Sequence, residues 1–132
     1  MNPEQNIIEI RENPHENYTD FYMHSDKGQL TSSIDLNTLE YEIIDYIIYN
    51  AYRRQGYGKE LFKFGVDHAK SIGAQAIIGV NIVSRESINV IASVIGEDKV
   101  TIEKLGDYTP QGKDDNSVNR TKASFRYDTR AL

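Results

Sequence analysis

The periodicity of apolar residues changes in the middle of the chain, and this change limits the folds available to it. Glu40 to Tyr49 is rich in Ile and Tyr, as strands are. From Gly58 to Ile72 the apolar residues instead recur every three or four positions, which predicts one helix face, ending at Gly73. Ala74 to Val83 is almost continuously apolar, as in a strand buried on both faces. These three segments predict a βαβ unit with parallel strands and a right-handed crossover.

Shorter elements are predicted on both sides of this unit. Turn-forming residues separate the earlier apolar runs, which gives strand candidates at Asn6 to Glu12, Thr19 to Ser25, Gln29 to Leu36 and Glu40 to Tyr49. After the unit, Ser84 can cap a second helix that continues to Ile95; strands follow at Val100 to Leu105 and Ala123 to Arg130, with a polar loop over 106–122. We therefore expect an α/β fold over residues 1–132 as one domain. Its mixed sheet has an antiparallel N-terminal meander, the central parallel βαβ unit and C-terminal strands.

Composition narrows the classes of function. The chain has no cysteine, which excludes disulfide scaffolds, thiolate zinc sites, iron–sulfur clusters and a cysteine nucleophile. His15, His24 and His68 lack the spacing of metal ligands, so no metal is expected. No apolar run approaches the ~18 residues of a membrane span, and the N-terminus lacks the pattern of a signal peptide. A cytoplasmic protein without membrane contact is expected.

Charge is unevenly distributed along the chain. The net charge is −5, which argues against a dedicated nucleic-acid binder. Residues 1–50 hold ten acids against two bases, whereas residues 51–132 hold ten acids against thirteen bases. The N-terminal part therefore suits a cationic partner and the remainder an anionic one. The alternative is a solvated surface whose charge happens to be uneven.

The segment Tyr52 to Lys59 (YRRQGYGK) lies where a buried strand ends and a helix begins. A helix N-terminus presents unpaired N–H groups and partial positive charge, and so attracts phosphate. Glycines there remove the Cβ atoms that would keep a phosphate away, and Arg53 and Arg54 add positive charge. The segment therefore predicts an anion site, for which a pyrophosphate is the best candidate. The alternative is a tight turn whose glycines serve only close packing.

Two other phosphate-binding motifs do not match. Gly65 to Ser71 lacks the second glycine of a P-loop and lies inside the predicted helix. A Rossmann fingerprint needs a third glycine, and Leu61 occupies its place.

Arg53-x-x-Gly56-x-Gly58 resembles the (Q/R)-x-x-G-x-(G/A) signature with which the GNAT superfamily of N-acetyltransferases binds the pyrophosphate of acetyl-CoA. The resemblance extends over Ile47 to Phe62, which combines an apolar strand, a tyrosine–arginine turn, two glycines and an amphipathic helix. The order of the other predicted elements is similar as well.

The resemblance implies an acetyl-CoA-dependent N-acetyltransferase that transfers acetyl directly to a primary amine in a ternary complex. The strand through Val80 is expected to diverge from the strand ending at Ile48, which opens space for the thioester. Ile48 and Tyr49 would lie along the pantetheine arm, and Ser84 would stand where the family has an asparagine. The residues that would hold the pyrophosphate are Arg53, Arg54, Gln55, Gly56, Tyr57, Gly58 and Lys59.

Glu42 and Asp45 are the candidates for the general base that removes the ammonium proton of the acceptor. Because neighbouring strand residues alternate between faces, only one of the two is expected to point into the space between the strands. Position in the family favours Glu42, and Glu40 is a further candidate. The alternative is that these acids line a solvated face of the sheet.

The chain departs from the family pattern in two places. No aromatic residue lies between His68 and Tyr108, where many family members carry a tyrosine that protonates the departing thiolate. About six residues separate the first two predicted strands, where members usually place two helices over the acceptor. The acceptor side is therefore expected to be open, or closed by a second subunit of a homodimer, and to suit a protein lysine or N-terminus. The alternative function is a catalytically weak or inactive GNAT-fold protein that acts as a CoA-binding or protein-interaction module.

Overall fold

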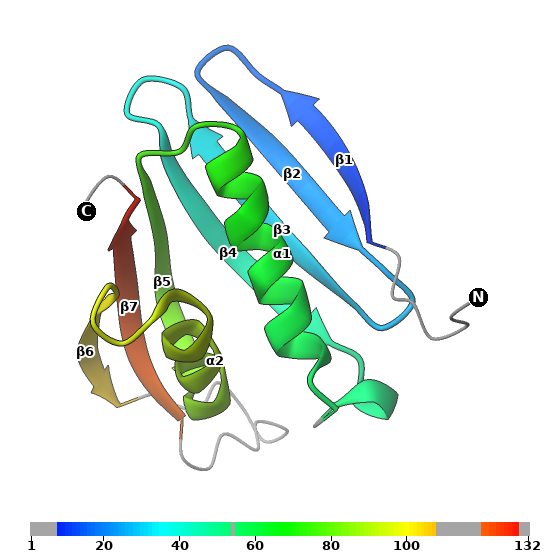
Figure 1. The fold of residues 1–132 in the computed structure, drawn as a ribbon, viewed down its shortest axis with the longest axis vertical. Helices are drawn as coiled ribbons and strands as arrows, with labels where there is room; N and C mark the ends of the chain where they lie inside the picture. Colours follow the sequence, from blue (N-terminus) through cyan, green and yellow to red (C-terminus); the bar gives the residue numbers. More distant parts are fainter. Residues whose placement is uncertain (1–7, 54, 108–119, 130–132) are drawn as a thin grey trace.

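The computed structural model describes residues 8–53, 55–107 and 120–129. Its strands form one mixed sheet in the order β1-β2-β3-β4-β5-β7-β6 (Figure 1). Only the β4–β5 pair is parallel; every other pairing in the sheet is antiparallel. The elements are β1 (Glu9–Pro14), β2 (Tyr18–His24), β3 (Gly28–Asp35), β4 (Glu40–Ile48), the 3-10 turn η1 (Asn50–Tyr52), α1 (Tyr57–Ser71), β5 (Ala76–Ser84), α2 (Arg85–Ile95), β6 (Thr101–Asp107) and β7 (Arg120–Asp128). The expected fold class is confirmed.

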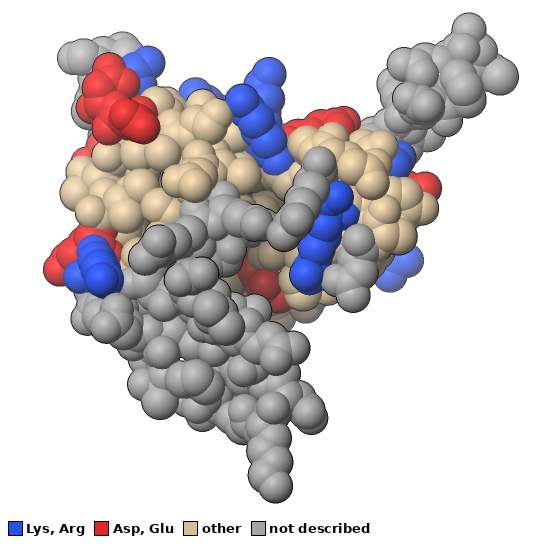
Figure 2. All heavy atoms as spheres, turned by 90° about the horizontal axis from the view of Figure 1, so that it is seen from below, with Lys and Arg blue, Asp and Glu red and all other residues tan. Residues whose placement is uncertain are grey.

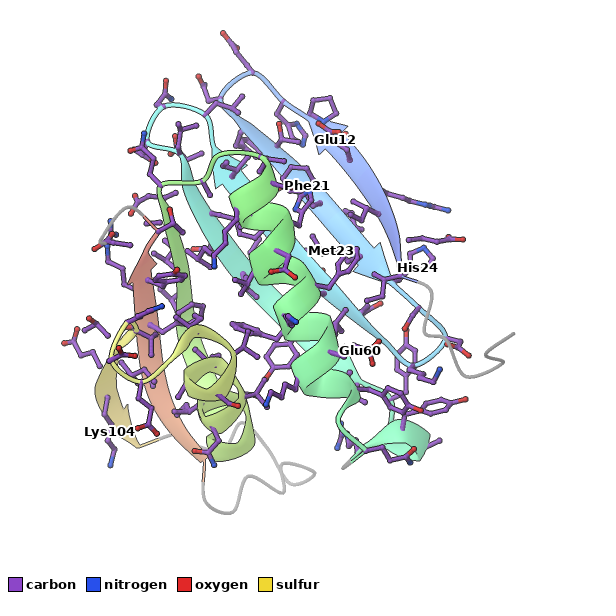
Figure 3. All side chains as sticks on the ribbon, viewed as in Figure 1. Glu12, Phe21, Met23, His24, Glu60 and Lys104 are labelled. Carbon is purple, nitrogen blue, oxygen red and sulfur yellow. The ribbon has the colours of Figure 1, made fainter. Side chains whose placement is uncertain are left out.

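Both helices lie on the same face of the sheet. α1 packs across β3 and β4, α2 packs against β5 and β7, and the two helices contact each other (Figure 1). The core lies between them and the sheet, and Phe21 and Met23 of β2 lie beneath α1 (Figure 3). No described helix covers the other side of the sheet, which we call the open face. The two described helices have 15 and 11 residues, and neither is long and apolar enough to span a membrane.

α1 follows from its sequence as expected. Its buried residues are Leu61, Phe62, Gly65, Val66 and Ala69, which recur at three- and four-residue spacing and so lie on one side of the helix. The helix ends at Ser71, and Gly73 takes a left-handed conformation (φ 82°) just beyond.

β4 contains a bulge that the sequence pattern does not reveal. Its register with β3 pairs Ile43 with Ser32 and Asp45 with Thr31, so Ile44 has no partner on β3. An extra residue of this kind bends its strand and changes which face the following residues occupy.

β4 and β5 pair only over three residues. Glu40 to Glu42 pair with Ala76 to Ile78, although β4 continues to Ile48 and β5 to Ser84. Beyond this point the two strands separate (Figure 1). The expected divergence is therefore present, and we call this region the split.

The predicted loop between the last two strands is too long at both ends. Gly106 pairs with Lys122 and Asp107 with Thr121, so β6 and β7 extend into polar sequence that reads locally as a loop. Pairing with a partner strand stabilises such residues, and local composition does not reveal the partner. The first strand is also shifted: β1 runs from Glu9 to Pro14, and Asn6 and Ile7 lie outside the described residues.

Candidate active site

Glu42 and Asp45 lie on the same side of β4, on the open face. Their β3 partners are Ser33 and Thr31, which are two residues apart and therefore share a face. Tyr41 and Ile43, by contrast, are buried in the core beneath α1. The expectation that only one of the two acids can face the split is wrong. Residues three apart on a regular strand lie on opposite faces, but the extra residue Ile44 moves Asp45 to the same face as Glu42.

The carboxylates of Glu42 and Asp45 have no hydrogen-bond or ion-pair partner among the described residues. Glu42 is half-buried at the last paired residue before the split, and Asp45 is exposed three residues further on. The third candidate, Glu40, forms a salt bridge with Arg126 of β7. Glu42 and Asp45 are therefore the acids available to a ligand at the split.

The turn between β4 and α1 leaves the helix N-terminus open. Gly56 precedes α1 in a left-handed conformation (φ 86°), and no side chain caps the helix. A Cβ added at Gly56 would meet nothing within 4 Å. No side chain therefore competes for the unpaired N–H groups of the first helical turn, and Gly56 leaves space beside them, as a site for an anion requires.

The two glycines of the motif have different roles. A Cβ at Gly58 would lie 3.6 Å from Cγ1 of Ile48 and 3.9 Å from Cε2 of Tyr46, which is ordinary packing distance. Gly58 is half-buried and faces β4, and the space around it would accept a Cβ. Only Gly56 stands in open space at the helix terminus.

Side chains of the turn hold the backbone in place. The Nε of Arg53 donates a hydrogen bond of 3.0 Å to the carbonyl oxygen of Ile48, and Nε2 of Gln55 donates one of 3.2 Å to that of Ala51. The exposed Arg53 guanidinium is thereby anchored beside the end of β4. Arg54 lies outside the described residues.

The remaining predicted cofactor residues divide between the two sides of the split. Tyr49 is exposed directly after β4, and Lys59 is exposed on the first turn of α1. Tyr57 is half-buried at the start of α1, and Ser84 is the last residue of β5, directly before α2. Figure 2 views this end of the molecule and shows basic side chains spread among acidic ones.

Lys27 is a residue of this region that sequence reasoning missed. It comes from the β2–β3 hairpin, and its Nζ lies 4.9 Å from the ring centroid of Tyr57 and 5.9 Å from that of Tyr52. Its side chain is only 12% exposed, and its carbonyl oxygen accepts a hydrogen bond from the N–H of Tyr49. Lys27 therefore connects the hairpin to the turn through cation–π contacts. Only the β3–β4 register, which pairs Gly28 with Ile48, could have indicated this position.

A chain of hydrogen bonds crosses the core beneath α1. The hydroxyl of Ser32 donates to Tyr41 Oη (2.7 Å), and Tyr41 Oη lies 3.0 Å from Nδ1 of His68. Burial raises the pKa of Tyr41 above its ordinary value. Burial also lowers the pKa of His68, which nearby Glu12 partly opposes. His68 is thus a helix residue packed against Tyr41 and Phe21. No group of three or more His, Asp or Glu among the described residues could hold a metal ion.

These features define a class of protein. A mixed sheet whose one parallel pair separates beside an uncapped helix N-terminus is the arrangement that the resemblance to N-acetyltransferases implied. The sequence profile of the Acetyltransferase (GNAT) family matches residues 3–93. The chain belongs to this family, and its enzyme class is that of the acetyltransferases.

Solved structures show the same fold. An acetyltransferase from Bacillus subtilis in complex with CoA is 14% identical (TM-score 0.67; 94% of this chain and 99% of that chain covered). The ribosomal-protein-S18-alanine N-acetyltransferase of Escherichia coli is 19% identical (TM-score 0.58; 87% and 71% covered). Spermidine N-acetyltransferase from Vibrio cholerae, in complex with CoA and spermine, is 11% identical (TM-score 0.57; 86% and 66% covered). No curated protein sequence matches the chain.

Proposed function

We propose that this protein transfers an acetyl group from acetyl-CoA to a primary amine. The observation that carries the proposal is the split between β4 and β5 beside the open N-terminus of α1. Structural neighbours with the same fold were crystallised with CoA, which supports a CoA thioester as the acetyl donor.

The residues around the split fit the parts of this donor. The N–H groups at the start of α1 would hold the pyrophosphate, with Gly56 leaving room for it and the Arg53 guanidinium beside it. Because β4 no longer pairs with β5 beyond Glu42, the backbone N–H of Ile48 could bond an amide-bearing arm, while its carbonyl oxygen already accepts a hydrogen bond from Nε of Arg53. The N–H and carbonyl oxygen of Tyr49 bond Lys27 and Tyr52, so Tyr49 would contribute its exposed side chain. The remaining contacts would come from Arg54, Gln55, Tyr57, Gly58, Lys59 and Ser84.

Glu42 and Asp45 would prepare the acceptor amine. One carboxylate removes a proton from the ammonium group, directly or through water, because only the neutral amine has a lone pair for attack. The nitrogen then bonds to the thioester carbonyl carbon and loses its second proton to water, the carbon–sulfur bond breaks, and CoA leaves as a thiolate. No aromatic residue lies between His68 and Tyr108, so we assign the proton that the thiolate takes up to water. We favour Glu42 as the base, because it is half-buried at the point where β4 and β5 begin to separate.

The open face supports a cationic acceptor that is larger than a small free amine. Only residues 15–17 separate β1 from β2, which leaves no room for helices at that point of the chain. The open face carries Asp20, Asp35, Glu42 and Asp45, which attract an ammonium group. We therefore propose a lysine or an N-terminal amine of a protein as the acceptor.

The alternative, a CoA-binding or interaction module without turnover, is favoured by one observation. α2 has no tyrosine that could act as the usual acid, and Val90, Ile91 and Ala92 occupy its middle. Release of free CoA thiol distinguishes the two functions, because the module would bind acetyl-CoA without consuming it.

The test combines thermal unfolding with turnover. Acetyl-CoA at a hundredfold excess over its dissociation constant should stabilise the protein by ~2.7 kcal/mol, or roughly 8 °C. Arg53→Ala should reduce the shift, whereas Lys63→Ala, on the exposed side of α1, should not. Thiol release should require a lysine-containing peptide. A protein whose melting temperature does not respond to acetyl-CoA would contradict the proposed cofactor site.

A further inference from the structure

A pocket of about 290 Å³ lies on the sheet at some distance from the split. It is lined by Arg11 of β1, by Tyr22, Met23 and His24 of β2, and by Gln29 of β3. Met23 has its side chain buried beneath α1, so it borders the pocket from below. His24 lies near the end of β2, beside β1 (Figure 3).

The other four side chains lie on the open face. Tyr22 and His24 are two residues apart on β2, and both alternate with the buried Met23. Arg11 pairs with Tyr22 across β1–β2, and Gln29 pairs with His24 across β2–β3. Paired residues share a face, so the pocket lies on the same side of the sheet as Glu42 and Asp45.

The chemistry of the pocket differs from that of the rest of the open face. Its polar side chains, Arg11, Tyr22, His24 and Gln29, can all donate hydrogen bonds, and none of the lining residues is acidic. The Arg11 guanidinium has no hydrogen-bond or ion-pair partner among the described residues. Oε2 of Glu9 lies 3.5 Å from Nε2 of His24. Glu9 pairs with His24 from β1, whereas Gln29 pairs with it from β3, and Glu9 does not line the pocket. Tyr22 is 50% exposed and adds an apolar ring at the rim.

The register relates this pocket to the proposed acetylation site. Arg11, Tyr22, Thr31 and Asp45 are successive partners across β1, β2, β3 and β4, so they form one row of side chains. Three strand spacings separate β1 from β4, which is about 14 Å. The pocket is at the lower limit of small-molecule sites in size, so it suits one group of a larger ligand.

We propose that the Arg11 pocket binds a carboxylate of the acceptor whose amine is acetylated beside Asp45 and Glu42. A guanidinium binds carboxylate through two parallel hydrogen bonds, and Gln29 and Tyr22 can add further ones. A carboxylate fits better than a phosphate, because a dianion would be repelled more strongly by the acids of this face. The acceptor is then a peptide with an acidic group about four extended residues from its reactive amine. This inference rests on the proposed function for the amine, but the anion site itself can be tested without turnover.

The first experiment measures the pocket directly. The full chain is titrated with butyrate, a monoanion like a glutamate side chain, at constant ionic strength, and amide shifts are followed by NMR. Saturable shifts should appear at Arg11, Tyr22, His24 and Gln29, should be lost in Arg11→Gln, and should persist in the control Lys63→Gln. Neutral butyramide should give none, and inorganic phosphate should bind several-fold more weakly. Equal shifts in wild type and Arg11→Gln, or phosphate binding as tight as butyrate, would overturn the proposal.

The second experiment connects the pocket to acetyl transfer. Two lysine peptides are compared that differ only by Glu or Gln four positions from the lysine. Wild type should show about tenfold higher kcat/KM for the Glu peptide. Arg11→Gln should remove this preference while keeping kcat/KM for the Gln peptide, and Lys63→Gln should change neither. A preference that survives in Arg11→Gln would overturn the inference. Absence of transfer to both peptides would count against the proposed function instead, and the butyrate titration would still decide the pocket.

Discussion

At the scale of single residues, the sequence identifies the glycines and acids of the candidate site but not the role of each one. Gly56 and Gly58 look equivalent in the motif, yet one adopts a left-handed conformation in open space and the other packs against Ile48. Glu42 and Asp45 look as though they should face opposite ways, yet both lie on the open face. Substitutions at each pair therefore distinguish roles that the motif alone cannot.

The two glycines should respond differently to alanine. Gly56→Ala should destabilise the protein by about 1 kcal/mol, because an L-residue is strained at φ 86°. Gly58→Ala should leave stability unchanged or raise it, because its Cβ would find ordinary contacts and alanine favours helix. Urea unfolding midpoints of both variants measure this difference. Equal losses of stability would mean that Gly58 is also under conformational constraint.

The two acids should contribute unequally to turnover. Glu42→Gln should lower kcat/KM for an amine acceptor about 100-fold or more, which is the usual size of a general-base contribution. Asp45→Asn should have a smaller effect, mainly on the KM of the acceptor, because the exposed Asp45 attracts the ammonium group. Steady-state kinetics with one lysine peptide tests this. The reverse order of effects would reassign the base to Asp45.

At the scale of elements, α1 lies along β4 and contacts it near both ends. Its N-terminus borders the proposed pyrophosphate site, and its far end places His68 against Tyr41, next in sequence to Glu42. Phe21 packs edge-on against the His68 ring at a centroid distance of 4.5 Å. His68 therefore connects α1 to β4 through Tyr41 and to β2 through Phe21.

Stability should depend on pH through His68. Burial lowers the pKa of His68 in the folded state, so between that value and its ordinary pKa of about 6.5 the unfolded chain binds more protons. This contribution is complete above pH 6.5 and is lost as the pH falls through the pKa of the unfolded chain. His68→Gln should therefore flatten the stability curve between pH 8 and pH 5, relative to wild type. Denaturant unfolding at both pH values measures this, and parallel curves would show that His68 does not couple to folding.

At the scale of the whole molecule, the sheet separates two kinds of surface. The helices cover one face and contribute the start of α1, while the open face carries most of the acids of the first four strands. These acids give a negative charge to the open face, where we propose that the acceptor binds. This division suits an enzyme whose two substrates have opposite charge.

Ionic strength should affect the acceptor through this face. Raising the salt concentration from about 50 to 500 mM shortens the range of electrostatic attraction from about 14 Å to about 4 Å. The KM of a lysine peptide with several positive charges should rise several-fold, and that of a peptide with a single positive charge should rise less. Initial rates at saturating acetyl-CoA measure both values. Equal changes would show that the acidic residues of the open face do not guide the acceptor.

Several features were accessible from the sequence because they arise locally. The apolar period of α1, its end at Gly73 and the strand–turn–helix that contains Arg53 and Gly56 depend on interactions within a few residues. The continuous apolar run likewise indicated that β5 is a central strand, but the expected burial on both faces was wrong, since Val80 is 51% exposed. For these segments a residue's own conformational preference and its near neighbours decide the structure.

The tertiary structure decided where the remaining groups lie. The bulge at Ile44 depends on how two strands fit each other, and it alone brings Glu42 and Asp45 to one face. The contact of Lys27 with Tyr57 and the row from Arg11 to Asp45 likewise follow from strand register. Register is a relation between segments distant in sequence, so a local pattern can indicate that a strand exists without showing which side chains it places together.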